Sequence, residues 1–365
     1  MSDVAIVRCP NYDKDVVEKA LPKALEAVPL PPLAGKVVLL KPNVLSDAPV
    51  RKAITTNPQI LKALIRLIKT KSPKEILVGD SPGLQPPSFR PNAAGIVQVC
   101  EEEDVRWVDF TKDTVEREVP YTGGMKLPFA RIFDTVDVLI TLPKAKTHKL
   151  MYATGALKNQ FGLVPGLHKS PCHVAKQSRE DFADLIVGIN TLFKPSWCLM
   201  DAIIAMEGDG PANGTPRHMG LLLASRDPVA MDWAEGVLMG YDPTTLPVVT
   251  QALKHGLGQK PSYPLLNAGD LAFKDWQRIP QRKSNLVRDL LLPFFTRRFK
   301  HEQKRPAPVF GSPDCILCQR CVQICPANAL TVRGKTIEID QRRCVRCYCC
   351  HEMCPANAIT IKERV

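Results

Sequence analysis

Two familiar nucleotide-binding signatures are missing from this sequence. It contains no GxxxxGK[ST] phosphate loop and no GxGxxG run after an apolar segment. Both motifs hold phosphates against backbone amides at a helix N-terminus. The sequence therefore does not predict ATP or NAD binding by these means, and it leaves flavin binding undecided.

Long apolar runs and a secretory leader are missing too. No apolar stretch reaches the length of about 18 residues that a membrane-spanning helix needs. Residues 2–9 resemble a strand and lack the basic region and apolar stretch of a secretory signal. We therefore expect a cytoplasmic protein in a reducing compartment, where clustered cysteines bind metals more often than they form disulfides.

Acidic residues are scarce only in the last quarter of the chain. The formal net charge is +12, and residues 274–305 alone hold ten Lys or Arg against three Asp or Glu. Residues 1–273 hold 31 against 29. Nucleic-acid-binding domains are typically basic along a whole face, so this distribution does not predict nucleic-acid binding.

Eight of the thirteen cysteines form a tandem repeat near the C-terminus. Each half has the spacing Cys-x2-Cys-x2-Cys-x3-Cys-Pro, beginning at Cys315 and at Cys344. This spacing is typical of bacterial ferredoxins with two [4Fe–4S] clusters, in which the last cysteine of each run binds the other cluster. We predict that cluster 1 is bound by Cys315, Cys318, Cys321 and Cys354, and cluster 2 by Cys344, Cys347, Cys350 and Cys325.

A structural zinc site is the main alternative for clustered cysteines. Zinc sites typically use two separated CxxC pairs rather than four cysteines in one run, so the sequence favours iron–sulfur clusters. The extra Cys349 stands where the first run has Arg320, and we predict a packing role for it. The isolated cysteines are predicted to be buried as small apolar side chains: Cys9, Cys100, Cys172 and Cys198.

Residues 1–270 alternate between strand-like and helix-like segments. Strand-like runs occur at 36–40, 75–78, 105–110, 136–142, 197–204 and 221–224, and helical spacing at 58–70, 182–193 and 229–239. This alternation predicts a mostly parallel sheet in a three-layer α/β domain. We expect the α/β domain at 1–270, a basic linker at 271–310 and a small α+β ferredoxin-like domain at 311–365.

Polar turns rich in Gly and Pro follow five of these strands. Ligands bind at the carboxyl ends of strands in open parallel sheets, so the turns together predict one shared crevice. Gly, Pro and Asp also form turns without any function, so no single turn decides the matter. The predicted ligand-binding residues are Lys41, Asn43, Asp80, Asn159 and Asp209, and the candidate catalytic residues are Lys144, Lys146, His148, Lys158 and Glu207.

The segment 144–173 is basic, contains several glycines and has no acidic residue. This composition suits the binding of an anionic small molecule such as a carboxylate or phosphate. Lysines would bind the anion, and His148 or Glu207 would exchange protons. A solvated basic surface loop is the alternative.

Five short motifs appear in a fixed order. They are KPN at 41–43, GDSPG at 79–83, LPKAKTH at 142–148, GALKNQFGLVPG at 155–166 and MEGDGP at 206–211. Together they resemble the family called domain of unknown function 362, many members of which carry a C-terminal ferredoxin module. The resemblance implies an iron–sulfur protein of prokaryotic metabolism and implies no particular reaction. A more distant likeness to nickel-dependent lactate racemase folds is not accompanied by that enzyme's motifs.

Within the linker, residues 288–300 combine apolar and basic side chains around Pro293. One interpretation is a basic amphipathic segment in peripheral contact with a membrane. The interpretation we favour is a tether whose apolar residues pack on the large domain. A basic surface near the clusters also suits an acidic electron donor or acceptor of the ferredoxin or flavodoxin type.

Three functions follow from these features. We favour an oxidoreductase in which two [4Fe–4S] clusters pass electrons to an anionic substrate or cofactor in the α/β domain. The first alternative is a non-catalytic electron-transfer subunit whose large domain docks on a partner enzyme. The second is a non-redox enzyme with structural or regulatory clusters. Charged side chains that converge in a closed site would favour an enzyme, whereas an open face would favour a carrier.

Overall fold

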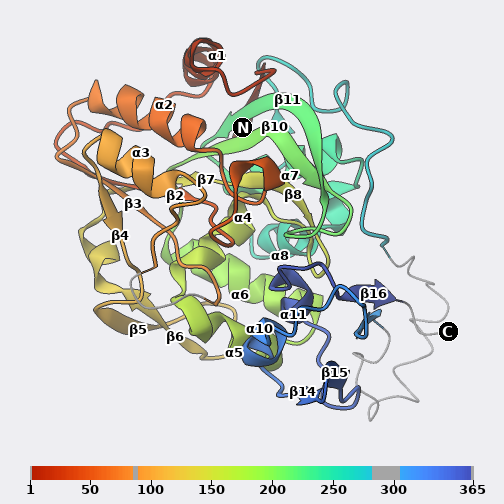
Figure 1. Cartoon of the computed structure of the whole chain (residues 1–365). Coiled ribbons are helices and arrows are strands. Elements are labelled where there is room, and N and C mark those ends of the chain that lie inside the picture. Colours follow the sequence, from red (N-terminus) through yellow and green to blue (C-terminus); the bar gives the residue numbers. More distant parts are fainter. Residues whose placement is uncertain (1, 85–88, 282–304, 363–365) are drawn as a thin grey trace.

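The structure is a computed structural model that describes residues 2–84, 89–281 and 305–362 (Figure 1). The large domain is built on one ten-stranded sheet with the main order β12-β1-β11-β10-β7-β2-β3-β4. These strands are β1 (Ser2–Arg8), β2 (Val37–Pro42), β3 (Glu75–Gly79), β4 (Arg106–Val108), β7 (Val138–Leu142), β10 (Trp197–Glu207), β11 (Thr215–Ser225) and β12 (Pro261–Ser262).

The centre of the sheet is parallel, as predicted. Strand β2 pairs in parallel with β3 and β7, β3 with β4, and β7 with β10, whereas β11 pairs antiparallel with β1 and β10. All six residues of β2 are buried, because a parallel strand is covered on both faces. Val37 and Leu39 enter one core, while Val38 and Leu40 enter the other, as the two-residue period of a strand requires.

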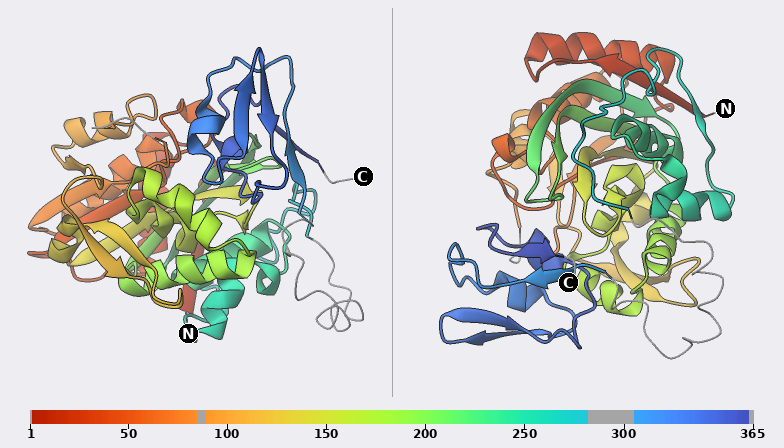
Figure 2. Two further views of the ribbon diagram at one scale, coloured as in Figure 1. Left: turned by 90° about the horizontal axis from the view of Figure 1, so that it is seen from below. Right: turned by 90° about the vertical axis from the view of Figure 1, so that its right-hand side faces the viewer.

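Helices cover both faces of this sheet (Figures 1 and 2). The helices form two layers. The first layer packs in the core that contains Val38, and the second packs in the core that contains Val37. Helix boundaries follow local signals, as where the Asn57 side chain accepts a hydrogen bond from Gln59 N and Pro58 opens the helix. The first layer is α1 (Lys14–Ala27), α2 (Pro58–Lys69) and α3 (Ile96–Glu102), and the second includes α4 (Gly155–Asn159), α6 (Arg179–Leu192), α7 (Pro228–Leu238) and α8 (Pro247–Lys254).

One segment differs from the sequence analysis. Residues 144–148, expected in a polar turn, form strand β8 (Lys144–His148), which is buried throughout and pairs with β10 and with β9 (Tyr152–Ala153). The prediction of a turn was wrong because most polar side chains of this segment form hydrogen bonds inside the protein and do not need solvent. The remaining elements of this domain are the β5 (Thr114–Glu118) and β6 (Lys126–Ala130) hairpin, α5 (Lys169–Ala175) and short 3-10 turns at Val50–Lys52, Arg131–Thr135, Gln160–Leu163, Gly166–His168 and Pro243–Thr245.

The small C-terminal domain combines two two-stranded sheets with two short helices. Its buried core is small and includes Cys321 and Cys350 beside Leu330, Ile337 and Ile359. Because a core of this size contributes little stability, bound metal must contribute much of it. The elements are β13 (Ala307–Val309), paired with β16 (Thr360–Lys362), β14 (Leu330–Arg333), paired with β15 (Thr336–Ile339), α10 (Arg320–Ile324) and α11 (Cys349–Glu352).

The small domain packs on the large one with α11 turned toward it (Figures 1 and 2). Tyr348 belongs to the large-domain core. Asn213 Nδ2 donates to His351 O at 2.7 Å, and Arg305 Nη2 donates to Gln177 O at 2.8 Å. The second cysteine run is therefore the one that faces the large domain.

The structure describes residues 271–281 and 305–310 of the predicted linker. Trp276 and Ile279 are buried in the large-domain core, and β13 belongs to the small domain. The segment 288–300, with its predicted membrane contact or packing, lies outside the described residues, and the domain boundaries stay predictions. No helix among the residues that the structure describes is long and apolar enough to span a membrane.

Candidate functional site

The cysteines of the predicted first cluster surround one space in the small domain. Cys315, Cys318, Cys321 and Cys354 all line a cavity of about 270 Å³. Burial raises the pKa of Cys321, and the neighbouring thiols of Cys318 and Cys354 raise it further. Thiols this close repel one another as thiolates unless a positive centre lies between them, so this donor set suits a bound cluster.

The cysteines of the predicted second cluster are also neighbours. Burial raises the pKa of Cys350, and the thiols of Cys347, Cys344 and Cys325 raise it further. The pKa of Cys344 is raised by burial and, in addition, by Cys347 and Cys325. The four cysteines of each predicted set are therefore neighbours in the structure, including the crossed Cys354 and Cys325, and their assignment to cluster 1 or cluster 2 stays a prediction.

The backbone repeats the same conformation in both runs. Leu317 and Gln319 have φ angles of 53° and 60°, and the equivalent Arg346 and Tyr348 have 52° and 67°. Non-glycine residues adopt this left-handed region mainly where their surroundings impose it. Turns of this kind point successive N–H groups into a concavity that suits iron–sulfur clusters. Donor set and backbone therefore both fit a [4Fe–4S] cluster in each half.

The other cysteines do not join these sets. Cys349 is buried, and its thiol contacts Cys347. The isolated thiols are all buried, which raises their pKa values to about 11 for Cys9 and about 12 for Cys100 and Cys172. Within the described chain, no three His, Cys, Asp or Glu side chains are placed to hold a single metal ion.

A hydrogen-bonded network joins five of the residues predicted to share a ligand site. Lys41 Nζ donates to Asp80 Oδ1 at 2.8 Å and to Asn159 Oδ1 at 3.3 Å. Asn43 Nδ2 donates to Asn159 Oδ1 at 3.1 Å, and Lys146 Nζ donates to Asn43 Oδ1 at 2.6 Å. These residues lie at the ends of β2 and β3, in β8 and in α4, so the sheet edge does gather them.

The ion pair in this network is closed. The Lys41 and Asp80 side chains are 0% and 3% exposed, and Val44 N also donates to Asp80 Oδ2 at 2.6 Å. A Cβ atom at Gly162 would lie 2.0 Å from Asp80 Oδ1 and 2.5 Å from Lys41 Nζ. Glycine at 162 therefore allows the backbone to cover the pair, which then positions neighbours more readily than it binds a ligand.

Three other predicted residues lie away from this network. Lys144 Nζ donates to Asp201 Oδ2 and Tyr12 Oη, both at 2.8 Å, in a buried cluster of its own. Glu207 Oε2 accepts from Gln277 N at 3.0 Å and Oε1 from Arg217 at 3.4 Å. Asp209 forms a salt bridge with Lys149 near the surface. The structure does not bring these three side chains to the network.

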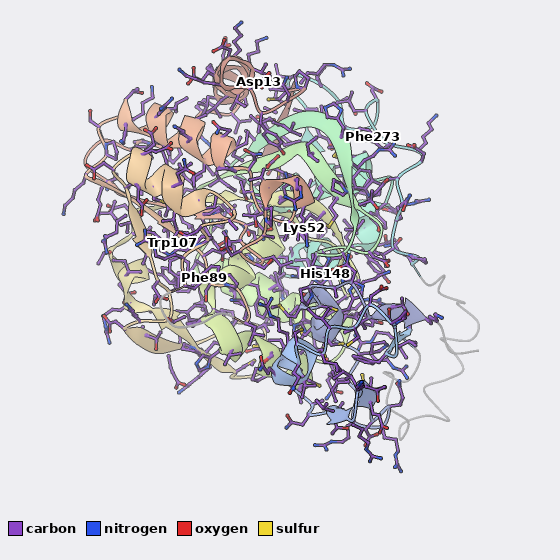
Figure 3. All side chains as sticks on the ribbon, viewed as in Figure 1. Asp13, Lys52, Phe89, Trp107, His148 and Phe273 are labelled. Atoms are coloured by element: carbon purple, nitrogen blue, oxygen red, sulfur yellow. The ribbon has the colours of Figure 1, made fainter. Side chains whose placement is uncertain are left out.

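The fixed hydrogen bonds of His148 decide its tautomer. Leu150 N and Met151 N both donate to His148 Nδ1, at 3.1 and 3.2 Å. Nδ1 is therefore an acceptor, and the neutral ring carries its proton on Nε2. Burial lowers the pKa of His148 well below its ordinary value, and Lys158 and His173 lower it further. His148 is a neutral donor through Nε2, which lies 3.2 Å from Glu352 Oε1 beside α11 (Figure 3).

Lys158 differs from the other lysines of the site. Its side chain is half-buried and has no hydrogen-bond or ion-pair partner among the residues described. Burial lowers its pKa, while Glu352 and Cys349 raise it. Burial, together with the nearby charge of Lys158, lowers the pKa of Lys146 to about 7. We call Lys146, His148, Lys158, His173 and Glu352 the interdomain site.

Sequence reasoning missed Glu352. It lies on α11 between Cys350 and Cys354, and burial raises its pKa while Lys158 and Lys146 lower it. Its equivalent in the first cysteine run is Gln323. A comparison of the two runs position by position, beyond the cysteines, would have marked Glu352 as a departure from the repeat.

The run Gly79–Gly83 has the letters of a GxSxG nucleophile turn. In such a turn a helix follows the serine directly. Here the next described helix is α3, and Ser81 Oγ accepts a hydrogen bond from Gly166 N at 2.8 Å. Ser81 is buried and does not have the exposed position of a nucleophile.

The chain matches two known families. Residues 38–235 match the family described as domain of unknown function (DUF362), which is more than half of the sequence. The chain belongs to the DUF362 family. Residues 301–358 match the 4Fe–4S dicluster domain, and the protein carries two [4Fe–4S] clusters.

A curated relative extends over most of this DUF362 protein. It is the thylakoid-associated protein of Synechocystis sp., 30% identical over 289 residues, covering 76% of this chain and 88% of that protein. Its name places that protein at the thylakoid. For the chain described here, a cytoplasmic location stays a prediction.

Two solved structures are weakly similar to this DUF362 protein. One is a protein of Thermotoga maritima, with a TM-score of 0.40, 13% identity and coverage of 58% of this chain and 55% of that one. The other is the lactate racemase apoprotein of Thermoanaerobacterium thermosaccharolyticum. Its TM-score is 0.36 and its identity 12%, and the match covers 59% of this chain and 54% of that one. The chain thus spans little more than half the length of each, and likenesses of this strength do not bear on activity.

Proposed function

We propose that this iron–sulfur protein is an oxidoreductase that binds an anionic small molecule at the interdomain site. The observation that carries the proposal is Lys158, an amine without a side-chain partner in the described residues, held next to Glu352 of the cluster-bearing domain. Lys41, Lys144 and Lys146 each have an acceptor within 3 Å. A half-buried amine that has no protein acceptor takes water or a ligand as its partner, so Lys158 is the lysine of this site that is open to an anion.

Neighbouring side chains support the same interpretation. His173 Nδ1 is buried and forms no hydrogen bond within the described part of the chain, and the contact of His148 Nε2 with Glu352 Oε1, at 3.2 Å, is not a well-formed hydrogen bond. Buried polar atoms are nearly always paired, so the unpaired His173 nitrogen and the weakly paired His148 nitrogen favour a bound molecule. The charges of Lys158, His173 and Lys146 lower the pKa of His148, so these groups are near enough to interact electrostatically.

Each side chain then has a separate task. Lys158 and the charged form of Lys146 bind the anionic group through charge-assisted hydrogen bonds. His148 orients the molecule by donating from Nε2. Lys146, with a pKa of about 7, is the group best suited to exchange a proton. When bound, the clusters supply single electrons beside this site.

Reoxidation of reduced protein tests the proposal. Anaerobic holoprotein, reduced with dithionite and freed of excess reductant, is mixed with a panel of small carboxylates and phosphate esters, and the cluster EPR signal is followed. We expect at least one anion to reoxidise the protein. Lys158→Gln should slow this reaction and weaken binding tenfold or more, since a charge-assisted hydrogen bond contributes about 1.5–3 kcal/mol. Lys71→Gln, which changes an exposed lysine, is the control.

Other results would support the alternatives. Reoxidation by a carrier protein but by none of the anions would favour an electron-transfer subunit. Conversion of an anion without any change in cluster oxidation state would favour a non-redox enzyme. Equal rates for Lys158→Gln and the wild-type protein would remove the interdomain site from the proposal.

A further inference from the structure

The two cysteine runs differ in their access to solvent. Cys318 in the first run is exposed, and its neighbour Ile316 is 66% exposed, more than any other large apolar side chain in the described residues. The cysteine of the second run that is equivalent to Cys318 is Cys347, and it is half-buried. Figures 1 and 2 show α11 toward the large domain and the β14–β15 hairpin away from it. Cluster 1 therefore belongs to the outer end of the molecule.

Exposed positive charge surrounds this outer end. Arg320 is exposed and directly precedes Cys321, and the exposed Lys335 lines the cavity that Cys315 and Cys318 share. Glu338, one of the exposed acidic residues of the small domain, pairs with Arg333, with 3.1 Å between Oε2 and Nε. The described exposed charges of the small domain are predominantly basic: Arg320, Arg333, Lys335, Arg342, Arg343 and Lys362 against Asp314, Glu338 and Asp340.

We propose that Ile316, Cys318, Arg320 and Lys335, the cluster-1 face, form the docking surface for an acidic one-electron carrier protein. An exposed apolar centre with a charged rim is a common arrangement for a transient interface. The acidic side is assigned to the carrier by charge complementarity. One electron leaves the reduced carrier and one is gained by the dicluster domain, and no proton or bond is exchanged.

This inference concerns electron entry and not the reaction at the interdomain site. A basic patch raises the association rate with an acidic partner and makes it fall with ionic strength. Small reductants need no docking surface. A defect limited to the carrier would therefore identify the face, independently of any substrate.

The test uses anaerobic holoprotein and reduced flavodoxin as the acidic carrier. The double variant Arg320→Glu and Lys335→Glu is compared with Lys126→Glu and Lys254→Glu, which reverse two exposed charges on the large domain. We expect the first pair to weaken flavodoxin binding and slow reduction at least tenfold at low salt. Reduction by dithionite and the iron content should be unchanged, and high salt should remove the difference.

Equal binding and reduction of the wild-type protein and the cluster-1 variant would overturn the proposal. An equal defect in the large-domain control would also overturn it, because the rate of reduction by flavodoxin would then depend on total charge and not on this face. If the double variant loses iron, Lys335→Glu alone takes its place. That variant reverses one charge of the face without altering a residue next to a cluster cysteine, and the same criteria apply.

Discussion

Gly162 is the residue on which the Lys41–Asp80 pair most directly depends. An added methyl group would overlap Asp80 Oδ1 and Lys41 Nζ, so Gly162→Ala must separate the ions or move the backbone. Disrupting a buried ion pair or overpacking a core typically costs about 1–5 kcal/mol. We expect Gly162→Ala to lower the free energy of unfolding by about 3 kcal/mol, measured by anaerobic denaturant titration.

A second glycine provides the control. A Cβ atom at Gly83 would meet only Ile324, at an ordinary contact distance of 3.9 Å. Gly83→Ala should therefore change stability little. If both variants were equally stable, the close packing of Gly162 against the ion pair would be contradicted.

Lys146 makes stability depend on pH. Its pKa in the folded protein is about 7, below the ordinary value of 10.5, so between these values the unfolded chain binds more protons. The free energy of unfolding then rises with pH from about 7 toward 10, by up to about 1.4 kcal/mol per pH unit. Burial also lowers the pKa of Lys169 to about 7, so we expect Lys146→Met to reduce this rise and not to abolish it.

Parallel stability curves check this prediction. Thermal unfolding of the wild-type protein, Lys146→Met and Lys71→Met is measured at several pH values above 7. The wild-type and Lys71→Met curves should keep a constant separation, whereas the wild-type and Lys146→Met curves should diverge. A constant separation for all three would mean that Lys146 keeps its proton.

At the scale of elements, α11 carries two adjacent cysteines with different predicted roles. Only Cys350 has the spacing of a cluster ligand, while Cys349 packs beside it. With two [4Fe–4S] clusters the protein holds about eight irons. We expect Cys350→Ala to lose about four of them and Cys349→Ala to lose none, by iron and sulfide analysis. Full iron content in Cys350→Ala would mean that Cys349 can replace it.

Elements with a strong pattern were predictable from the sequence. The helix predicted at 58–70 is α2, and the run 75–78 is β3 with one more residue. Strand β8 was not predictable, because Lys144, Lys146 and His148 look like a solvated turn. Their acceptors lie on segments distant in sequence, such as Asp201 and the Ile54 carbonyl, so no local pattern shows them.

At the scale of the whole molecule, the two domains should respond differently to loss of iron. The large domain has two extensive apolar cores, whereas the small core has few buried residues and two of them are cysteines. We expect anaerobic chelation to unfold the small domain and leave the α/β sheet folded, because metal binding is coupled to folding. Limited proteolysis should then cut within 305–362 and spare 2–281, and a single cooperative loss of both would contradict this.

The candidate site shows where sequence reasoning ends. Lys41, Asn43, Asp80, Lys146 and Asn159 could be grouped because they follow parallel strands or a glycine-rich motif. Glu352 could not, since its position depends on how a second domain packs on the first. Lys144 was predicted on the same grounds as Lys146, and only its pairing with Asp201 shows why a lysine is buried there.

The unequal exposure of the two cysteine runs has a consequence for the lifetime of the protein in air. Oxidants reach a thiolate-bound cluster most readily where its ligands meet solvent, and Cys318 is exposed whereas its equivalent in the second run, Cys347, is half-buried. Damage therefore begins at the outer cluster. A molecule with an oxidised cluster 1 keeps cluster 2 and the contacts of the small domain with the large one. It has lost the cluster through which a redox partner would pass electrons to it.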